Sequence, residues 1–408
     1  MGAQKYHLRC IRCLKEFDSF ETKYVCLLCG ANLEVINDLK KIKKKLTKRY
    51  FANNKDCSIW RYCELLPSVK PRQFPRVGWT PLYNACALGK KLGFSDLFLK
   101  DDSLNPSASF KDRASLAALA HALDLNEKVI TVASTGNAAS SLACLAAGQD
   151  IKTMIFVPRS APIAKLTQVL IFGAKVFAVN GTYDRAYDLC LEASKLYGWY
   201  NRSTGYNPFT REGKKTCSFE ICEQLNWKAP DKVFVPVGDG NIISGIWKGF
   251  KEFYGMGLIN KLPKLVAVQA VSSNAVKKAF ESDEVIRGVK PATIADSISV
   301  SIPRDGEAAV KALKQSGGFA VSVTDNEILR AMDMLANTSG VFAEPAGAAS
   351  IAGLQKAKAL GLVKKQERIV ALITGNGLKD IASAVKVINK PCAVAGIKDI
   401  KKQFGGKF

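Results

Sequence analysis

Residues 129–148 read VITVASTGNAASSLACLAAG: a short apolar run, a turn that contains glycine, and a longer stretch with helical spacing. The same order recurs along the chain, and each apolar run is followed by a stretch with helical character. The runs do not alternate with polar residues, which is typical of strands buried on both faces of a parallel sheet. The sequence therefore predicts an α/β fold whose strand-end turns lie where open α/β sheets bind ligands. The further runs lie at 151–157, 175–179, 232–237, 265–270 and 368–374.

The length and composition limit the class of protein. A chain of 408 residues is too long for one compact core, so we expect two lobes with a small appendage. We find no signal-like segment at the start and no uninterrupted apolar run that could cross a bilayer, and we expect a cytoplasmic protein without a membrane partner. The sequence holds only two histidines, which argues against a Ser-His-Asp hydrolase.

The formal net charge of +23 raises the question of an anionic partner. The densest basic tract, KKIKKKLTKR at 40–49, has no interleaved aromatic residues and matches no nucleic-acid-binding module. We interpret it as a solvated helical face. A basic field also attracts small anionic substrates, and the charge alone does not decide among these alternatives. The partner that we predict is a small anionic amino acid rather than a nucleic acid.

Four of the twelve cysteines form two pairs near the start of the chain. Cys10 and Cys13 form one CxxC motif, Cys26 and Cys29 form another, and twelve residues separate the pairs. Two such knuckles complete a tetrahedral zinc site, and four cysteine ligands leave no open position for catalysis. The alternative is four ordinary thiols at this spacing. We predict a structural Zn²⁺ ribbon.

Lys111 is the first candidate for chemistry, in the segment Pro-Ser-Ala-Ser-Phe-Lys-Asp-Arg at 106–113. A lysine placed where a helix begins feels the positive end of the helix dipole, which favours its neutral amine. A neutral amine is what bonding to an aldehyde requires. Taken alone, Lys111 would more often be a surface lysine.

Three further segments follow strands. Ser-Thr-Gly-Asn-Ala at 134–138 is small enough for a ligand to approach the amides of a helix start. Val-Gly-Asp-Gly-Asn at 237–241 is a glycine-rich turn that opens a helix and can in principle cradle a phosphate. Thr-Gly-Asn-Gly-Leu-Lys-Asp at 374–380 places a hydroxyl at a strand end. Taken alone, each segment would more simply be an ordinary cap or turn.

Taken in order, SFKDR, STGNA, the glycine-rich turn, FAEPAGAAS (342–350) and TGNGLKD resemble the threonine synthase family. The resemblance implies the two-lobed fold type II of pyridoxal-phosphate enzymes, the tryptophan synthase β-like arrangement, with parallel sheets and an N-terminal four-cysteine zinc ribbon. It further implies a division of the chain into a ribbon-like segment at 1–36, a large cofactor-binding α/β domain at 37–108 and 205–408, and a small α/β domain at 109–204.

The resemblance also implies residue roles. Lys111 corresponds to the lysine that forms the Schiff base with pyridoxal 5'-phosphate, Asn137 to the residue at the ring hydroxyl, and Thr374 to the hydroxyl at the ring nitrogen. The cofactor phosphate and the substrate carboxylate are each implied to lie in a turn. These turns comprise Gly238, Asp239, Gly240 and Asn241 for the phosphate, and Ser134, Thr135 and Gly136 for the carboxylate.

The implied reaction converts O-phospho-L-homoserine and water to L-threonine and phosphate, in a homodimer, with Lys111 as nucleophile and general base. In typical members a segment NPxRxEGxKT supplies an arginine for the substrate phosphate. Residues 207–216 here read NPFTREGKKT, so Thr210 stands at that position, and Arg202 and Arg211 are the alternative candidates. The phosphate turn is also one residue shorter than usual, and a carboxylate such as that of Asp239 repels a phosphate unless it turns away.

These departures keep other activities open. One is a cysteate synthase, which would combine O-phosphoserine with sulfite; another is an ammonia-lyase of the threonine dehydratase or diaminopropionate lyase type. A catalytically silent relative that binds nucleic acid is the non-enzyme alternative.

Overall fold

The computed structural model describes residues 6–19, 24–71, 73–389 and 391–404. It begins with a three-stranded antiparallel sheet in the order β2-β1-β3. The basic tract follows as two short helices whose lysines are exposed, in agreement with the solvated face expected for it. The bounds are β1 Tyr6–Cys10, β2 Glu16–Phe17, β3 Leu33–Asn37, α1 Leu39–Lys43, α2 Lys48–Asn53 and the 3-10 helix η1 Ile59–Leu65.

The large lobe is built on a six-stranded sheet in the order β12-β11-β10-β13-β5-β4. Every neighbouring pair is parallel except β4 with β5. This sheet confirms the predicted α/β class with parallel strands. The bounds are β4 Leu82–Asn84, β5 Asp96–Asp101, β10 Lys232–Pro236, β11 Lys264–Ala270, β12 Phe319–Val323 and β13 Arg368–Ile373.

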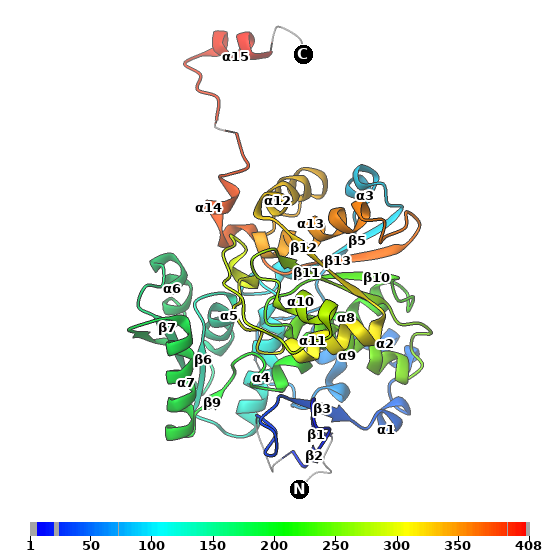
Figure 1. Ribbon diagram of the computed structural model, residues 1–408, viewed down its shortest axis with the longest axis vertical. Coiled ribbons are helices and arrows are strands. Elements are labelled where there is room, and N and C mark those ends of the chain that lie inside the picture. Colours follow the sequence, from blue (N-terminus) through cyan, green and yellow to red (C-terminus); the bar gives the residue numbers. More distant parts are fainter. Residues whose placement is uncertain (1–5, 20–23, 72, 390, 405–408) are drawn as a thin grey trace.

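Helices cover both faces of the large sheet (Figure 1). The central strand β10 shows why: Val233 and Val235 lie in the core on one face, and Phe234 lies in the core on the other. Period-two alternation of two apolar sets explains the unbroken apolar run in the sequence. One face carries α8 Phe209–Gln224, α9 Asn241–Gly255, α10 Ala275–Ser282 and α11 Gly306–Ser316; the other carries α3 Cys86–Leu92, α12 Asp325–Ser339 and α13 Pro345–Ala359.

The small lobe, green at the left of Figure 1, is a four-stranded parallel sheet in the order β8-β7-β6-β9. Its strands match the predicted runs at 129–133, 151–157 and 175–179 to within a residue. The bounds are β6 Val129–Ala133, β7 Lys152–Pro158, β8 Lys175–Val179, β9 Tyr200–Asn201, α5 Asn137–Ala146, α6 Ile163–Leu170 and α7 Tyr183–Tyr197.

Helix α4 (Lys111–Asp124) joins the two lobes, since it packs against α5 of the small lobe and α8 of the large one. Its contact with α8 requires a glycine: a Cβ at Gly213 would lie 1.8 Å from the carbonyl oxygen of Arg113. The two helices therefore meet backbone to backbone. Helix α4 therefore belongs to both lobes. The predicted domain bounds at 108/109 and 204/205 stay a prediction.

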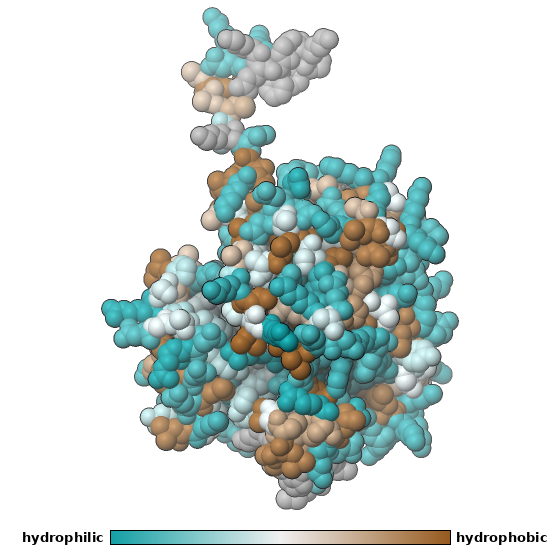
Figure 2. All heavy atoms as spheres, viewed as in Figure 1, coloured by the Kyte–Doolittle hydropathy of each residue, from teal (hydrophilic) through white to brown (hydrophobic). Residues whose placement is uncertain are grey.

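The remaining elements connect the lobes or close the chain. No helix in the described part of the chain is long and apolar enough to span a membrane. Helix α15 projects from the body of the molecule (Figure 1). Hydrophobic residues gather near α14, where the chain leaves the body (Figure 2). The bounds are η2 Asp102–Leu104, η3 Asp296–Ile298, η4 Gly377–Lys379, α14 Ile381–Ala384 and α15 Ile397–Phe404.

Candidate active site

A cavity of about 480 Å³ lies where the carboxyl ends of strands from both sheets face each other. The loops after β6, β10 and β13 line it, together with the first residues of α4, α5 and α9. This is the strand end at which ligands of α/β proteins bind. The predicted residues in its wall are Lys111, Ser134, Thr135, Gly136, Asn137, Arg202, Gly238, Asp239, Gly240, Asn241 and Thr374.

Lys111 is the first residue of α4, and its lead-in loop is fastened to the segment after β13. The amide of Phe110 donates to the carbonyl of Thr374 at 2.9 Å, and the amide of Asn376 donates to that of Ala108 at 3.1 Å. Burial lowers the pKa of Lys111 below the ordinary lysine value. The loop therefore fixes the start of α4 against the segment after β13, and Lys111, with an amine biased toward its neutral form, lines the same cavity as Thr374.

Asn137, the first residue of α5, reaches across the cavity to the large lobe. Its Nδ2 donates to both carboxylate oxygens of Glu344, at 2.9 and 3.1 Å, and to Oγ of Ser297 at 3.0 Å. Burial raises the pKa of Glu344. Gly375 makes this contact possible, because a Cβ there would lie 2.4 Å from Cδ of Glu344.

The turn at 238–240 is packed closely against neighbouring segments of the large lobe. Gly240 has φ +90° and caps α9, and a Cβ on it would come within 2.8 Å of the carbonyl oxygen of Asp305. Oδ1 of Asp239 accepts from the amide of Arg304 at 3.1 Å, and burial raises the pKa of Asp239. The first amides of α9 are thus left facing the cavity at the positive end of the helix dipole.

Two buried cations complete the wall. Arg202 is fully buried; Nη2 donates to Oγ of Ser115 at 3.0 Å, whereas Nε and Nη1 have no partner among the described residues. Burial lowers its pKa to about 10. Nζ of Lys214 donates to Oδ1 of Asn241 at 2.6 Å. Burial, followed by the charges of Lys111 and Arg202, lowers the pKa of Lys214 well below its ordinary value.

The comparisons with known proteins agree on the class. Residues 74–375 match the pyridoxal-phosphate dependent enzyme family. Threonine synthase of Methanocaldococcus jannaschii is 40% identical over 404 residues, which cover 97% of this chain and 99% of the relative. Threonine synthase of Methanosarcina acetivorans is 37% identical over 411 residues, with coverage of 98% and 99%. The chain belongs to the threonine synthase family.

Solved structures support the fold of this threonine synthase family member. Threonine deaminase isoform 2 of Solanum lycopersicum superposes with a TM-score of 0.66 at 25% identity, over 76% of this chain and 86% of that chain. Diaminopropionate ammonia lyase of Escherichia coli also gives 0.66, at 16% identity, over 84% and 92%. The predicted two-lobed fold type II is confirmed.

Of the residues predicted to bind cofactor or substrate, Arg211 alone lies outside the cavity wall. It is buried, and its Nη2 pairs with Oδ1 of Asp305 at 2.6 Å while Nη1 faces the carbonyl of Leu33 at 3.4 Å. One residue along a helix turns a side chain by about 100°. The position after Thr210 on α8 therefore points toward the cysteine ribbon, and the prediction of Arg211 as a substrate ligand needs correction.

The sequence reasoning did not single out Lys214 or Glu344, which also line the cavity. Lys214 follows Thr210 by one helical turn, so helical spacing was a usable signal for it. Glu344 lies within the FAEPAGAAS motif, but its contact with Asn137 joins two lobes and has no local signature.

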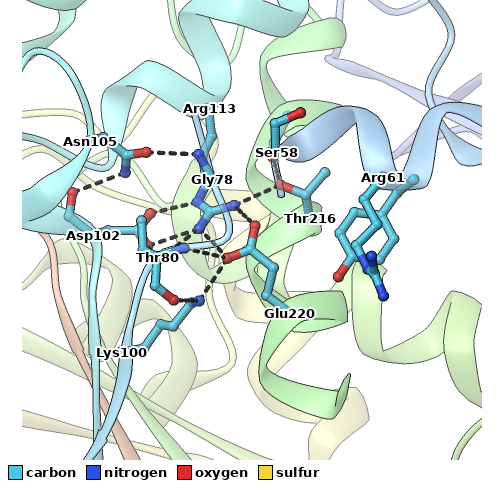
Figure 3. Close-up of polar contacts among 12 residues, drawn as sticks. Ser58, Arg61, Gly78, Thr80, Lys100, Asp102, Asn105, Arg113, Thr216 and Glu220 are labelled. Atoms are coloured by element: carbon cyan, nitrogen blue, oxygen red, sulfur yellow. Dashed lines mark hydrogen bonds and ion pairs between the residues drawn. The ribbon is translucent and has the colours of Figure 1, made fainter. Parts of the chain in front are cut away.

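A buried ion network holds α4, and with it Lys111, against the large lobe (Figure 3). Arg113 pairs with Asp102 and with Glu220, each at 2.5 Å, and Lys100 pairs with Glu220 at 2.6 Å. All four side chains are fully buried. The network is electrically balanced and joins α4, α8 and the end of β5.

The four cysteines of the two CxxC motifs meet as predicted, with all four Sγ atoms within 4.8 Å of one another. Sγ of Cys10 lies 3.5 Å from that of Cys29, and Sγ of Cys13 lies 3.6 Å from that of Cys26. A tetrahedral Zn²⁺ with bonds of about 2.3 Å requires separations of about 3.8 Å, so the donor set fits zinc.

Proposed function

We propose that the chain is a threonine synthase that converts O-phospho-L-homoserine and water to L-threonine and phosphate. The observation that carries the proposal is the meeting, in one cavity, of Lys111, the glycine turn at the start of α9, and the buried cations Arg202 and Lys214. The first two suit a phosphorylated aldehyde cofactor, and the cations suit a second anion.

The cavity residues fit pyridoxal 5'-phosphate. The lowered pKa of Lys111 favours the amine that an aldehyde bonds to. Neighbouring segments fill the space that a Cβ on Gly238 or Gly240 would need, so the tight turn that opens α9 requires glycine at both positions. The amides at the start of α9 can then bind a phosphate. Asn137 and Thr374 would hold the ring, with Asp239 and Asn241 completing the phosphate turn. When bound, the cofactor withdraws electrons from the bonds of the substrate α-carbon.

The protein residues would then divide the remaining work. The amides of Ser134, Thr135 and Gly136, at the start of α5, bind the substrate carboxylate at the positive end of that helix. Nζ of Lys111, freed by the substrate amine, takes the proton from Cα. A proton then leaves Cβ, and phosphate leaves Cγ with the C–O bonding electrons. A proton is added at Cγ, the hydroxyl of water adds at Cβ, a proton returns to Cα, and the remaining proton of water is carried by the released phosphate. Closure of the two lobes would exclude other water from the cavity.

The test is to incubate the purified holoenzyme with O-phospho-L-homoserine and to measure phosphate and L-threonine together. Equal amounts of both products support the proposal. Phosphate without threonine, or no reaction, contradicts it. A parallel incubation with O-phosphoserine and sulfite tests the cysteate synthase alternative, which shares the need for a phosphate site.

Three further features belong to this proposal. A structural Zn²⁺ would be held by Cys10, Cys13, Cys26 and Cys29, the donor set described above. The buried free thiols of Cys190, Cys217 and Cys222 suit a reducing, cytoplasmic location. A homodimer would cover the exposed apolar side chains near the C-terminal end of the body, which are Leu378, Ile381, Val385 and Ile388.

A further inference from the structure

Thr210 and Lys214 lie one turn apart on α8 and contact the same atom. Oγ1 of Thr210 lies 3.4 Å from Oδ1 of Asn241, and Nζ of Lys214 lies 2.6 Å from it. Residues four apart on a helix share a face. A long basic side chain at position 210 would therefore deliver its charge to the place that Nζ of Lys214 already occupies.

The cations around this point lack carboxylate partners of their own. Nε and Nη1 of Arg202 have no partner within the described ranges, and Nζ of Lys214 donates to a neutral amide oxygen, Oδ1 of Asn241. Asp305 pairs with Arg211. Asp239, whose Oδ1 accepts a backbone amide, is a single carboxylate near Lys111, Lys214 and Arg202 together, so it cannot balance the charges of all three. Buried charges are normally paired, so two such cations in a cavity wall point to an anionic ligand.

We propose that Lys214 and Arg202 together form the subsite for the phosphate of the substrate, and that Lys214 replaces the arginine that typical family members carry at the position of Thr210. The inference rests on the proposed function and deepens it. The cofactor phosphate goes to the amides at the start of α9, so the two phosphates use different groups. The subsite selects amino acids that carry a phosphate on the side chain.

The competing assignment is that Lys214 binds the cofactor phosphate, because Asn241 opens α9. The two assignments predict different losses in a Lys214→Met variant, which keeps most of the length of the side chain and removes its charge. A subsite for the substrate predicts weaker binding of phosphorylated substrate with unchanged cofactor affinity. A cofactor site predicts the reverse.

The control variant is Lys232→Met. Lys232 is also a buried lysine of the large lobe, paired with Glu367, but it begins β10 at the end of the sheet opposite the cavity. A rescue variant, Lys214→Gln with Thr210→Arg, moves the charge back one helical turn. Because Lys214 leaves the space, an arginine at 210 can reach Oδ1 of Asn241.

Three measurements are made on each holoenzyme: the KM for O-phospho-L-homoserine, displacement of that substrate by inorganic phosphate, and the change of cofactor absorbance on adding L-threonine, which has no phosphate. Apoenzyme is titrated with pyridoxal 5'-phosphate in parallel. The cofactor absorbance is also followed while inorganic phosphate is added. This readout and the cofactor titration report binding and do not require that the chain forms threonine. A failure of the proposed function would therefore be distinguishable from a failure of this inference.

We expect Lys214→Met to weaken binding of inorganic phosphate and of substrate about 10- to 100-fold, the loss for a charge-assisted hydrogen bond. Binding of L-threonine and of cofactor stays within about twofold of the Lys232→Met control, and the rescue variant recovers at least part of the phosphate affinity. Unchanged phosphate binding, or a loss of cofactor affinity as large as the loss of phosphate affinity, would overturn the assignment.

Discussion

Oδ2 of Asp305 accepts a hydrogen bond of 2.7 Å from Nδ2 of Asn241, the residue with which α9 begins. Its Oδ1 accepts from Arg211 at 2.6 Å and from Asn32 of the cysteine ribbon at 3.0 Å. One buried carboxylate thus joins the ribbon, α8 and the helix that opens at the phosphate turn. Burial alone would raise the pKa of Asp305, but the charge of Arg211 prevails and lowers it.

Asp305→Ala should therefore affect stability and cofactor affinity together. The substitution leaves the guanidinium of Arg211 buried without a carboxylate, which costs roughly 3–5 kcal/mol. It also frees Asn241, so we expect weaker binding of pyridoxal 5'-phosphate. Urea unfolding and a cofactor titration measure the two effects. The control is Glu307→Ala, whose pair with Arg12 is exposed and is worth at most about 1 kcal/mol; equal losses in the two variants would contradict the account.

Gly375→Ala tests the contact between the lobes. The new Cβ would lie 2.4 Å from Cδ of Glu344, so Glu344 must move away from Asn137. We expect a loss of stability of about 1–3 kcal/mol, as for overpacking of a core, and a lower kcat. Gly396→Ala, which meets nothing within 4 Å, serves as the control. Equal kcat and stability in the two variants would show that the packing around Gly375 is looser than described.

The pH dependence of stability should report the network of Figure 3. Burial would raise the pKa of Glu220, but the charges of Arg113 and Lys100 prevail and lower it. The folded state therefore binds the proton less readily than the unfolded state. The stabilisation is present in full above the unfolded-state pKa of about 4.3 and is lost as the pH falls toward the lower folded value.

Glu220→Gln removes this titrating group, so the free energy of unfolding should fall less steeply below about pH 4.3. The same substitution should also lower the free energy of unfolding at neutral pH, because it takes one charge from the buried network. Urea unfolding at several pH values measures it. Glu192→Gln, at an exposed pair with Arg185, should keep the slope of the unsubstituted protein. A slope unchanged by Glu220→Gln would mean that other carboxylates dominate acid unfolding.

Cys26→Ser should remove one thiolate from the ribbon, lower its zinc content and reduce the thermal stability of the ribbon. The cofactor should still bind at saturating concentration, because the Cys cluster is no part of the cavity wall. Metal analysis, thermal unfolding and cofactor absorbance are the measurements, with the exposed Cys392→Ser as the control. A chain that loses its cofactor at saturation would show that the ribbon does more than support the fold.

The sequence predicts those parts of the molecule that depend on local pattern. The unbroken apolar runs become parallel strands, and Lys111 is the first residue of α4, because strand burial and helix starts are marked within a few residues. Side-chain direction on a packed helix is different. Arg211 and Lys214 both lie on α8, yet only the packing of α8 against α9 and the ribbon decides that Lys214 faces the cavity and Arg211 does not.

Contacts between segments that lie far apart in the sequence also cannot be predicted from local sequence pattern. Local pattern does not mark Asp305, because its partners Asn32, Arg211 and Asn241 come from three distant segments. Glu344 and Asn137 meet only because the two lobes close on each other. Such contacts depend on the tertiary structure, and each segment alone reads as an ordinary turn or cap.

The most direct test of the central claim is to locate the cofactor lysine. Reduction of the holoenzyme with borohydride fixes pyridoxal 5'-phosphate to the lysine that holds it, and mass spectrometry of the peptides identifies that residue. The account predicts a label on Lys111 alone, and no label after Lys111→Ala. A label on Lys214, or on another lysine while Lys111 stays unmodified, would contradict it.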